Sequence, residues 1–383
     1  MPSVETKLSW NVAIVGTLIL SICFGAPWIL VVALKLIAAE TGGLRSVPAL
    51  AIALCWFGYG AGGILMARIA EKFGIRATVI FGAVMVAVGL ALSSGGAVWQ
   101  LYIGQGVFVG FFGIGSMNAP LYVYITRWFD RRRGSALALI SSGVYVAGAI
   151  WPSIFQRAIA GVGWRSTMFY FGLFAVFVII PLAIVFLRPA PELPVTGRAA
   201  QAGVLAHKVL DWPPNVTFSL LALAALFCCV PMAMPQAHLP ALCSDLGILA
   251  SHGAAMVSVL LGTAFICRQI IAMLGFVFTQ DEVALFTVSA AFGLGFSGII
   301  PAYVLAIREL FPAAEAFWRI PVFLLCAASG MAAGGWLAGV MYDRFGLYSV
   351  AFMAGVAANA VNLMIISLLV FRKERLAPAL ALR

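Results

Sequence analysis

The segment GQGVFVGFFGIG (residues 104–115) is followed by WFDRRRG (residues 128–134) and then by SALALISSGVYVAGAIWP (residues 135–152). Both flanking segments are apolar, rich in small residues, and part of runs long enough to cross a bilayer as helices. Small residues let helices approach closely in lipid, where the hydrophobic effect does not drive them together. The basic turn between them marks the cytoplasmic side, because cytoplasmic loops are enriched in Lys and Arg. This hairpin predicts a helical membrane protein.

The composition of the whole chain agrees with this class. Of its 383 residues, 63% are hydrophobic and 9% are charged, and the mean hydropathy is +1.08, whereas average proteins are about 25% charged. The fold class is therefore an all-α polytopic membrane protein. The net charge of +10 would suggest nucleic acid for a soluble chain; here it indicates basic cytoplasmic loops, and no nucleic-acid partner is expected. The cysteines and histidines show no metal spacing, so no metal or cofactor is expected.

Apolar runs of spanning length are distributed over two groups. They cover residues 12–38, 47–67, 77–97, 101–125, 135–156 and 166–187, and then 214–236, 253–278, 283–307, 320–342 and 347–371. The only long polar segment lies between the groups. We therefore expect an N-terminal six-helix bundle (1–187), a cytoplasmic linker (188–213) and a C-terminal bundle (214–383).

An internal repeat relates the two groups. The pattern at residues 120–127 recurs at 301–308, an offset of 181, and that at 163–169 recurs at 346–352, an offset of 183. Positions 34, 40 and 42 match positions 239, 245 and 247, an offset of 205. Such parallel repeats are typical of certain transporters. The fall in offset means that the second half lacks 24 residues between positions 247 and 301, about one helix, so we expect about 11–12 spans.

The basic residues predict the orientation. With both termini cytoplasmic and the two halves in register, 17 of the 23 Lys and Arg residues lie inside and four lie outside. If the run 253–278 crossed completely, the split would be 12 against nine, so the positive-inside rule favours the first arrangement. The run 253–278 then enters and returns, or packs as a broken helix, with Arg268 near the centre of the membrane.

The loop ARIAEKFGIR (residues 67–76) resembles a motif of the major facilitator superfamily, Gly-x-Leu-x-Asp-Arg-x-Gly-Arg-Arg. Glu71, Lys72, Gly74 and Arg76 stand at its acid, base, glycine and arginine positions, whereas positions 67 and 75 depart from it. The resemblance implies a major facilitator fold with two helical bundles. It also implies that Glu71 pairs with basic residues across a cytoplasmic gate, and Arg131 and Arg132 are the candidate partners. The alternative is a solvated loop with a turn glycine.

Other segments resemble the monocarboxylate and oxalate–formate porter branch of that superfamily. They are Trp128-Phe129 with the basic cluster 131–133, the triplet at 163–165, and the hairpin at 335–348. Two positions depart from the branch: Tyr102 replaces the arginine of proton-linked members, and Trp28 replaces the lysine of animal monocarboxylate carriers. The resemblance to this branch therefore does not imply proton coupling at either position.

Few polar residues within the spans are candidates for substrate contact. The resemblance implies that Arg268 binds a carboxylate, and the alternative is a snorkelling or displaced cytoplasmic residue. Asn118 and Tyr122 lie four residues apart, hence on one helix face; each can instead pack against a neighbouring helix. Lys35 is expected to snorkel to the interface. His238 is a weak candidate for sensing pH.

These residues indicate a secondary transporter that moves a small organic anion across the inner (plasma) membrane by alternating access. Its partners are the anion, the lipid bilayer, and a proton or counter-anion as candidate coupling ion. A drug or nitrogen-oxyanion porter and an internally deleted protein that transports nothing are the alternatives. A membrane-embedded enzyme would need clustered Asp, Glu or His within the spans, and the expected spans have none, so no catalytic residues are expected.

Overall fold

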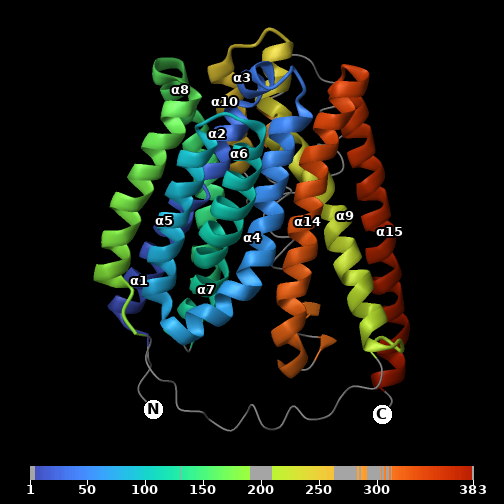
Figure 1. The fold of residues 1–383 in the computed structure, drawn as a ribbon. Coiled ribbons are helices and arrows are strands. Elements are labelled where there is room, and N and C mark those ends of the chain that lie inside the picture. The colour runs from blue at the N-terminus through green and yellow to red at the C-terminus, as the bar shows by residue number, and fades with distance from the viewer. Residues whose placement is uncertain are drawn as a thin grey trace.

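The computed structural model describes residues 5–129, 131–189, 209–262 and 313–381, with a few further positions between 283 and 311 (Figure 1). Its helices are α1 (Lys7–Cys23), α2 (Ala26–Val32), α3 (Leu34–Glu40), α4 (Ser46–Phe73), α5 (Ile75–Ser93), α6 (Val98–Ile103), the π-helix η1 (Gly104–Ile114), α7 (Gly115–Thr126), α8 (Arg133–Phe186), α9 (Pro214–Asp245), α10 (Ala250–Gly262), α14 (Ala313–Phe345) and α15 (Tyr348–Ala381). Eight helical segments in this part of the chain are long and apolar enough to cross a membrane. The predicted all-α membrane fold is confirmed.

The bundle has two ends, which we call the terminus end and the far end. Both chain termini lie at the terminus end, at the bottom of Figure 1, and α3 lies at the far end. Arg319, near the start of α14, bonds to Asn215 at the start of α9 over 3.0 Å, so both helices begin at the terminus end. Asp343, near the other end of α14, reaches the backbone of Arg45 at the far end. The helix α14 therefore runs in the direction that the repeat-based topology predicts.

The helix α8 contains two antiparallel crossings. Its 54 residues would extend for about 80 Å, far more than a bilayer's thickness. The backbone breaks at Gly163, whose φ of 80° is available to glycine at no steric cost. Before α8, the N–H of Arg131 bonds to Glu5 at the terminus end, and beyond this break Arg165 pairs with Glu40 at the far end. The two arms correspond to the predicted spans 135–156 and 166–187.

Glycines in α4 and η1 let two helical backbones touch. A Cβ atom added to Gly58 or Gly62 of α4 would collide with the backbone of η1, and one added to Gly110 would collide with the backbone at Cys55. This is the close approach that small residues permit in membranes. The close approach predicted for the glycine-rich segment 104–115 is thus present, and its partner is the second span.

The helix α9 passes through Pro231, Pro235 and Pro240 without ending. Prolines inside the apolar run 214–236 are expected from the sequence to break its helix, and this expectation is wrong for Pro231 and Pro235. Proline removes an N–H group but has a φ near the helical value, so the chain can continue with fewer backbone hydrogen bonds. The helix extends to Asp245, well beyond the predicted limit at residue 236. This extension places an acidic residue at the far end.

Matched positions of the repeat have matched backbone conformations. Gly42 and Gly247 have φ values of 92° and 76°, and Gly163 and Gly346 have φ values of 80° and 70°. Each glycine ends or reverses a helix in its own half, which supports the repeat. Residues 263–282, including Arg268, lie outside the described residues, as does position 301. The expected return of the run 253–278 and much of the 24-residue deficit fall in that part of the chain.

Candidate gate and central site

Charged side chains join the two halves of the chain at the far end. The guanidinium of Arg45 donates to both carboxylate oxygens of Asp245, at 2.6 and 2.7 Å. Lys35 also reaches Asp245, at 2.9 Å, and the hydroxyl of Ser244, at 2.9 Å. The side chain of Arg45 is only 9% exposed, and bidentate pairs of this kind are strong and geometrically specific. Lys35 lies at the far end of the bundle with its side chain 39% exposed, and there it has an acidic partner that the sequence did not predict.

The carboxylate of Asp343 completes this contact from α14. It accepts hydrogen bonds from the N–H groups of Arg45 and Ser46, at 2.8 and 2.9 Å, at the start of α4. A helix N-terminus favours a negative charge, because its first N–H groups have no partners within the helix. The guanidinium of Arg45 also lies over the ring of Tyr342, 3.7 Å from its centroid, which is a cation–π contact. We call Lys35, Arg45, Ser46, Ser244, Asp245, Asp343 and Tyr348 the far-end latch.

A difference between the two repeats explains why the latch joins one half to the other. Glu40, which matches Asp245, pairs with Arg165 of its own half at 2.7 Å. Arg165 follows Gly163 by two residues, and the residue that follows the matched Gly346 by two is Tyr348. Tyrosine carries no charge at neutral pH, so the second half offers Asp245 no arginine at this position. The cations for Asp245 come instead from the first half.

Hydrogen bonds between the halves are confined to one side of the bundle in the described part of the chain. Besides the latch, the hydroxyls of Ser153 in α8 and Ser258 in α10 lie 3.0 Å apart. Ser153 precedes the far-end turn at Gly163 by ten residues, so this contact also lies in the far half. The two halves are thus joined by polar contacts at the far end and by none among the described residues of the terminus end. The molecule is closed at its far end.

The residues predicted to form a gate lie at the terminus end. Gly74 has a φ of 84° and makes the predicted tight turn between α4 and α5. Glu71 and Lys72 are exposed, and Glu71 makes no ion pair with any described residue. Arg76 donates to the carbonyl of Leu187 in its own half, at 3.2 Å. None of these residues joins the halves in this conformation.

The basic turn after the fourth span binds the N-terminal segment. The N–H groups of Arg131 and Arg132 donate to one oxygen of Glu5, at 2.6 and 2.5 Å. The pairing expected between these residues and Glu71 is not formed in this conformation. The acid that meets the turn is Glu5, which precedes α1.

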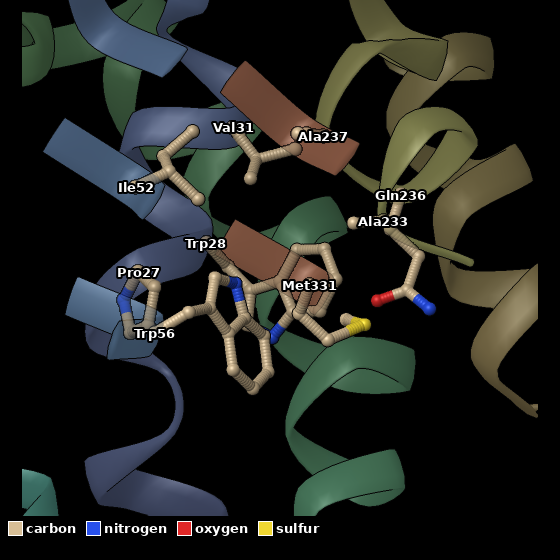
Figure 2. A pocket seen from close by; sticks show the side chains of 10 residues that line it. Pro27, Trp28, Val31, Ile52, Trp56, Ala233, Gln236, Ala237 and Met331 are labelled. Carbon is tan, nitrogen blue, oxygen red and sulfur yellow. The ribbon is translucent and has the colours of Figure 1, made fainter. Parts of the chain in front are cut away.

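A small cavity lies between the halves, in the layer beneath the latch (Figure 2). Its volume of about 20 Å³ is enough for a single water molecule. Trp28 and Trp56 of the first half face Gln236 and Met331 of the second. Gln236 is 4% exposed, and its side-chain N–H₂ group has no partner in the structure. The cavity therefore offers an unused donor between apolar walls.

The predicted substrate residues of the fourth span lie in α7. The side-chain oxygen of Asn118 is buried and has no hydrogen-bond partner. Tyr122 lies near Ser141, Tyr59 and Tyr145, which α8 and α4 contribute. Tyr122 therefore belongs to a group of tyrosines, and Asn118 has unused hydrogen-bonding capacity. Arg268 lies outside the described residues.

Several residues of the gate and cavity escaped the sequence reasoning. Asp245 and Asp343 lie outside the expected spans, and Gln236 lies at the last position of the expected span 214–236. Acidic residues near the ends of apolar runs, matched by basic residues near the ends of other runs, are a signal that would have suggested a gate. The pairing itself needs the tertiary structure, because Arg45 and Asp245 lie 200 residues apart.

The fold and the apolar spans are those of a multi-pass membrane transporter. Residues 15–271 match the family model of the Major Facilitator Superfamily. Because this match covers more than half of the chain, the protein belongs to that superfamily. The predicted family and its fold are confirmed, and the protein is a multi-pass membrane protein.

Curated relatives in this superfamily are distant. MFS-type transporter 1 of Ophiocordyceps sp. is 24% identical over 281 residues, which cover 73% of this chain and 57% of the relative. Human monocarboxylate transporter 11 is 25% identical over 312 residues, which cover 78% of this chain and 61% of the relative. The chain thus spans less than two thirds of the length of these relatives.

Solved structures share the fold across nearly the whole chain. A bacterial homolog of the human lysosomal transporter Spinster, in an inward-facing and unoccupied conformation, has a TM-score of 0.68 at 16% identity and covers 94% of this chain and 96% of its own. A peptide transporter POT in complex with sulfate has a TM-score of 0.72 at 14% identity, covering 96% and 95%. At these identities the likeness shows the fold alone.

Proposed function

We propose that this protein is a secondary transporter that moves a small organic anion across the inner (plasma) membrane by alternating access. The observation that carries the proposal is the closure of the far end by the latch, with room beneath it for only one water molecule. Residues 1–187 and 214–383 act as two bundles joined by the linker 188–213. They rock about the central site, so that only one end is closed at a time.

The chemistry of the central site suits an anion. Gln236 offers an unpaired donor, and no Asp or Glu lines the described cavity, so a carboxylate meets no like charge there. Arg268 supplies a planar, bidentate cation near the centre of the membrane. Asn118 and Tyr122 contact the anion from the first half. The names of the relatives, three of which are monocarboxylate transporters, support this substrate class.

The second gate forms at the terminus end in the opposite state. Glu71 and Lys72 are exposed, which supports an open terminus end in this conformation. When the halves rock, Glu71 pairs with basic residues at the ends of neighbouring helices, Arg131 and Arg132 among them. Gly74 forms the α4–α5 turn through its positive φ. Arg76 holds this turn through its hydrogen bond to the carbonyl of Leu187. With the termini in the cytoplasm, the terminus end is the cytoplasmic gate.

Uptake by the purified full chain in lipid vesicles tests the function. A panel of labelled carboxylates is offered with and without an imposed proton gradient, and accumulation of one or more of them above protein-free vesicles is expected. Arg268→Lys keeps the charge but loses the bidentate fork, so a higher KM is expected. Arg268→Gln should abolish uptake while the protein stays in the membrane. Uptake by Arg268→Gln at wild-type affinity and rate would contradict the anion-binding role of this arginine.

The aromatic lining of the cavity favours a second candidate, a porter of drugs or other apolar compounds. Trp28, Trp56 and Met331 present apolar surface, and aromatic and apolar walls are typical of such binding sites. Uptake of apolar dyes, with none of the carboxylates transported, would support this function. Nitrate and nitrite in the panel test for a nitrogen-oxyanion porter. No transport of any compound by a folded protein would indicate an internally deleted chain.

A further inference from the structure

A buried chain of hydrogen bonds connects the latch to a histidine. The Nη1 atom of Arg45 donates to the hydroxyl of Tyr348, at 2.7 Å. This hydroxyl lies 3.1 Å from Nδ1 of His238, whose Nε2 lies 2.8 Å from the carbonyl oxygen of Gly335. His238 is 0% exposed and Tyr348 is 2% exposed. The imidazole of His238 is therefore connected to the latch through Tyr348, and both of its ring nitrogens have hydrogen-bond partners.

The two ends of this chain determine the protonation state of His238. Arg45 can only donate, so the oxygen of Tyr348 accepts, and the Tyr348 O–H remains free to donate. The carbonyl of Gly335 can only accept, so Nε2 of His238 must carry a hydrogen. Tyr348 then donates to Nδ1, which must be unprotonated. All donors and acceptors in the chain are matched only when His238 is neutral.

The charges around His238 leave no place for another cation. The described groups that face it are Arg45 from the turn before α4, Asp343 from α14 and Tyr348 from α15. Asp245 of α9 and Lys35 of α3 complete the same cluster, which thus contains two cations and two carboxylates. Both carboxylates are already engaged by Arg45, Lys35 and the start of α4. A proton on Nδ1 would add an unpaired charge beside Arg45 and leave the Tyr348 O–H without its acceptor.

We propose that His238 is a proton-binding site linked to the far-end latch, occupied when this end is open and vacated when it closes. Opening separates Arg45 from Asp245 and lets water reach the imidazole, which then takes up a proton at Nδ1. Closing requires that this proton leave. Proton binding and latch closure exclude each other, so protons at the far side shift the population of the two states. The inference rests on the proposed alternating access, but not on the identity of the substrate.

The size of this effect follows from linkage. An exposed imidazole has a pKa of about 6.5. If the closed state binds no proton at His238, lowering the pH to about 5 should raise the ratio of open to closed molecules about 30-fold. At about pH 8 the same site should have no effect, because neither state then holds the proton.

Spin-label distances across the far end test this inference without any substrate. Labels at Trp99→Cys in the first half and Leu249→Cys in the second half report the distance between the halves. Both positions are exposed, at 57% and 66%, so they can be labelled. The native cysteines of the described chain are buried or half-buried, so they compete little for the label. Labels at Trp99→Cys and Val162→Cys, both in the first half, serve as the control pair. In the wild type the population with a long distance between the halves should grow between about pH 8 and about pH 5.

Three variants separate His238 from other titrating groups. His238→Gln keeps a donor for Gly335 and an acceptor for Tyr348 but binds no proton, so the distances should stay short at low pH. His252→Gln, which removes a histidine of α10 near the same end, should keep the wild-type response. If His238→Gln fails to fold, Tyr348→Phe removes the donor to Nδ1 and should reduce the response. A wild type without a pH response, or a His238→Gln variant that keeps it, would overturn the proposal; loss of anion uptake alone would affect only the proposed function.

Discussion

Arg45 makes contacts with three elements of the second half at once. Its guanidinium pairs with Asp245 of α9, stacks on Tyr342 of α14 and donates to Tyr348 of α15. A buried charge is tolerated only when it is paired and its hydrogen bonds are satisfied. The latch satisfies both conditions only while the halves are together. At the scale of residues, we therefore expect closure to depend on the buried guanidinium of Arg45 and its partners, with Lys35 as a more exposed second cation.

Asp245→Asn should open the far end. The change removes the charge that Arg45 and Lys35 share, and truncating one partner of a buried charge pair costs about 2–5 kcal/mol. The long-distance population of the Trp99→Cys and Leu249→Cys label pair should therefore increase at neutral pH. The matched control is Glu40→Gln, which breaks the equivalent ion pair with Arg165 inside one half. If both variants open the far end equally, the effect is not specific to the pair between the halves.

Glu40 should give an acid-sensitive contribution to stability. The hydrogen bond from Arg165, and then that from Trp164, lower the pKa of Glu40 below its ordinary value of 4.5. A depressed folded-state pKa contributes stability that is present above the unfolded value and is lost as the pH falls through the folded value. The difference in thermal midpoint between the wild type and Glu40→Gln should therefore be largest at neutral pH and shrink below about pH 4.5. A difference that grows on acidification would contradict this assignment.

Among the elements, α4 and α14 form the main contact between the halves. A Cβ atom added to Gly339 of α14 would lie 3.0 Å from the Cβ of Ala49 and 3.1 Å from the Cα of Ser46. One added to Gly60 of α4 would lie 2.9 Å from the Cβ of Ala328. These glycines let the two helices approach closely enough for Asp343 to reach the start of α4. Helix spacing, rather than charge alone, thus sets whether the latch can form.

Gly339→Val should hold the far end open. The new side chain would meet the backbone of Ser46 and the carbonyl oxygen of Arg45, 3.2 Å from its Cβ, and backbone atoms can move away only if the helices separate. The same label pair should show the long distance at all pH values. Gly161→Ala is the control, because nothing lies within 4 Å of its added Cβ, and it should leave the distances unchanged and raise stability by about 0.5–1 kcal/mol. Short distances in Gly339→Val would mean that the helix contact does not control closure.

The whole molecule combines a closed far end with two chain termini at the opposite end (Figure 1). The arms of α8 and the direction of α14 agree with the topology in which basic residues gather on the terminus side. Moving Lys or Arg across a bilayer costs a high free energy. Loops rich in these residues therefore stay on the cytoplasmic side, which is the positive-inside rule. We therefore expect the orientation of the molecule to be set by its loops and its conformational state to be set by contacts between its halves.

Reporter fusions test the orientation of the whole molecule. A reporter that is active only in the cytoplasm should be active after Arg133 and after Arg383, because both positions belong to the basic terminus side. The control fusion after Gly161, at the far-end turn of α8, should be inactive. An external signal after Arg383 would mean that the segment between residues 253 and 278 crosses completely and that the repeat-based register is wrong.

The sequence by itself determined the class, the spans and the turns of this protein. Hydropathy decides which segments enter a bilayer, since every backbone polar group there must be bonded within a helix. Gly74 was predicted to make a tight turn and has a positive φ, and the matched glycines of the repeat have matched positive φ values. These properties depend on composition and neighbours along the chain, so they can be predicted locally. The role of Arg268 stays a prediction, because this residue lies outside the described part.

Only the tertiary structure decided which charges meet. The sequence predicts that Lys35 reaches the interface but gives it no partner, and Asp245 and Asp343 lie outside the expected spans, yet all three belong to the latch. The partners come from segments about 200 to 300 residues apart, and no local pattern relates them. Their pairing depends on how closely α4 and α14 pack and on the tyrosine that replaces an arginine in the second repeat. Contacts between two halves are properties of their packing, so they appear only when both halves are folded together.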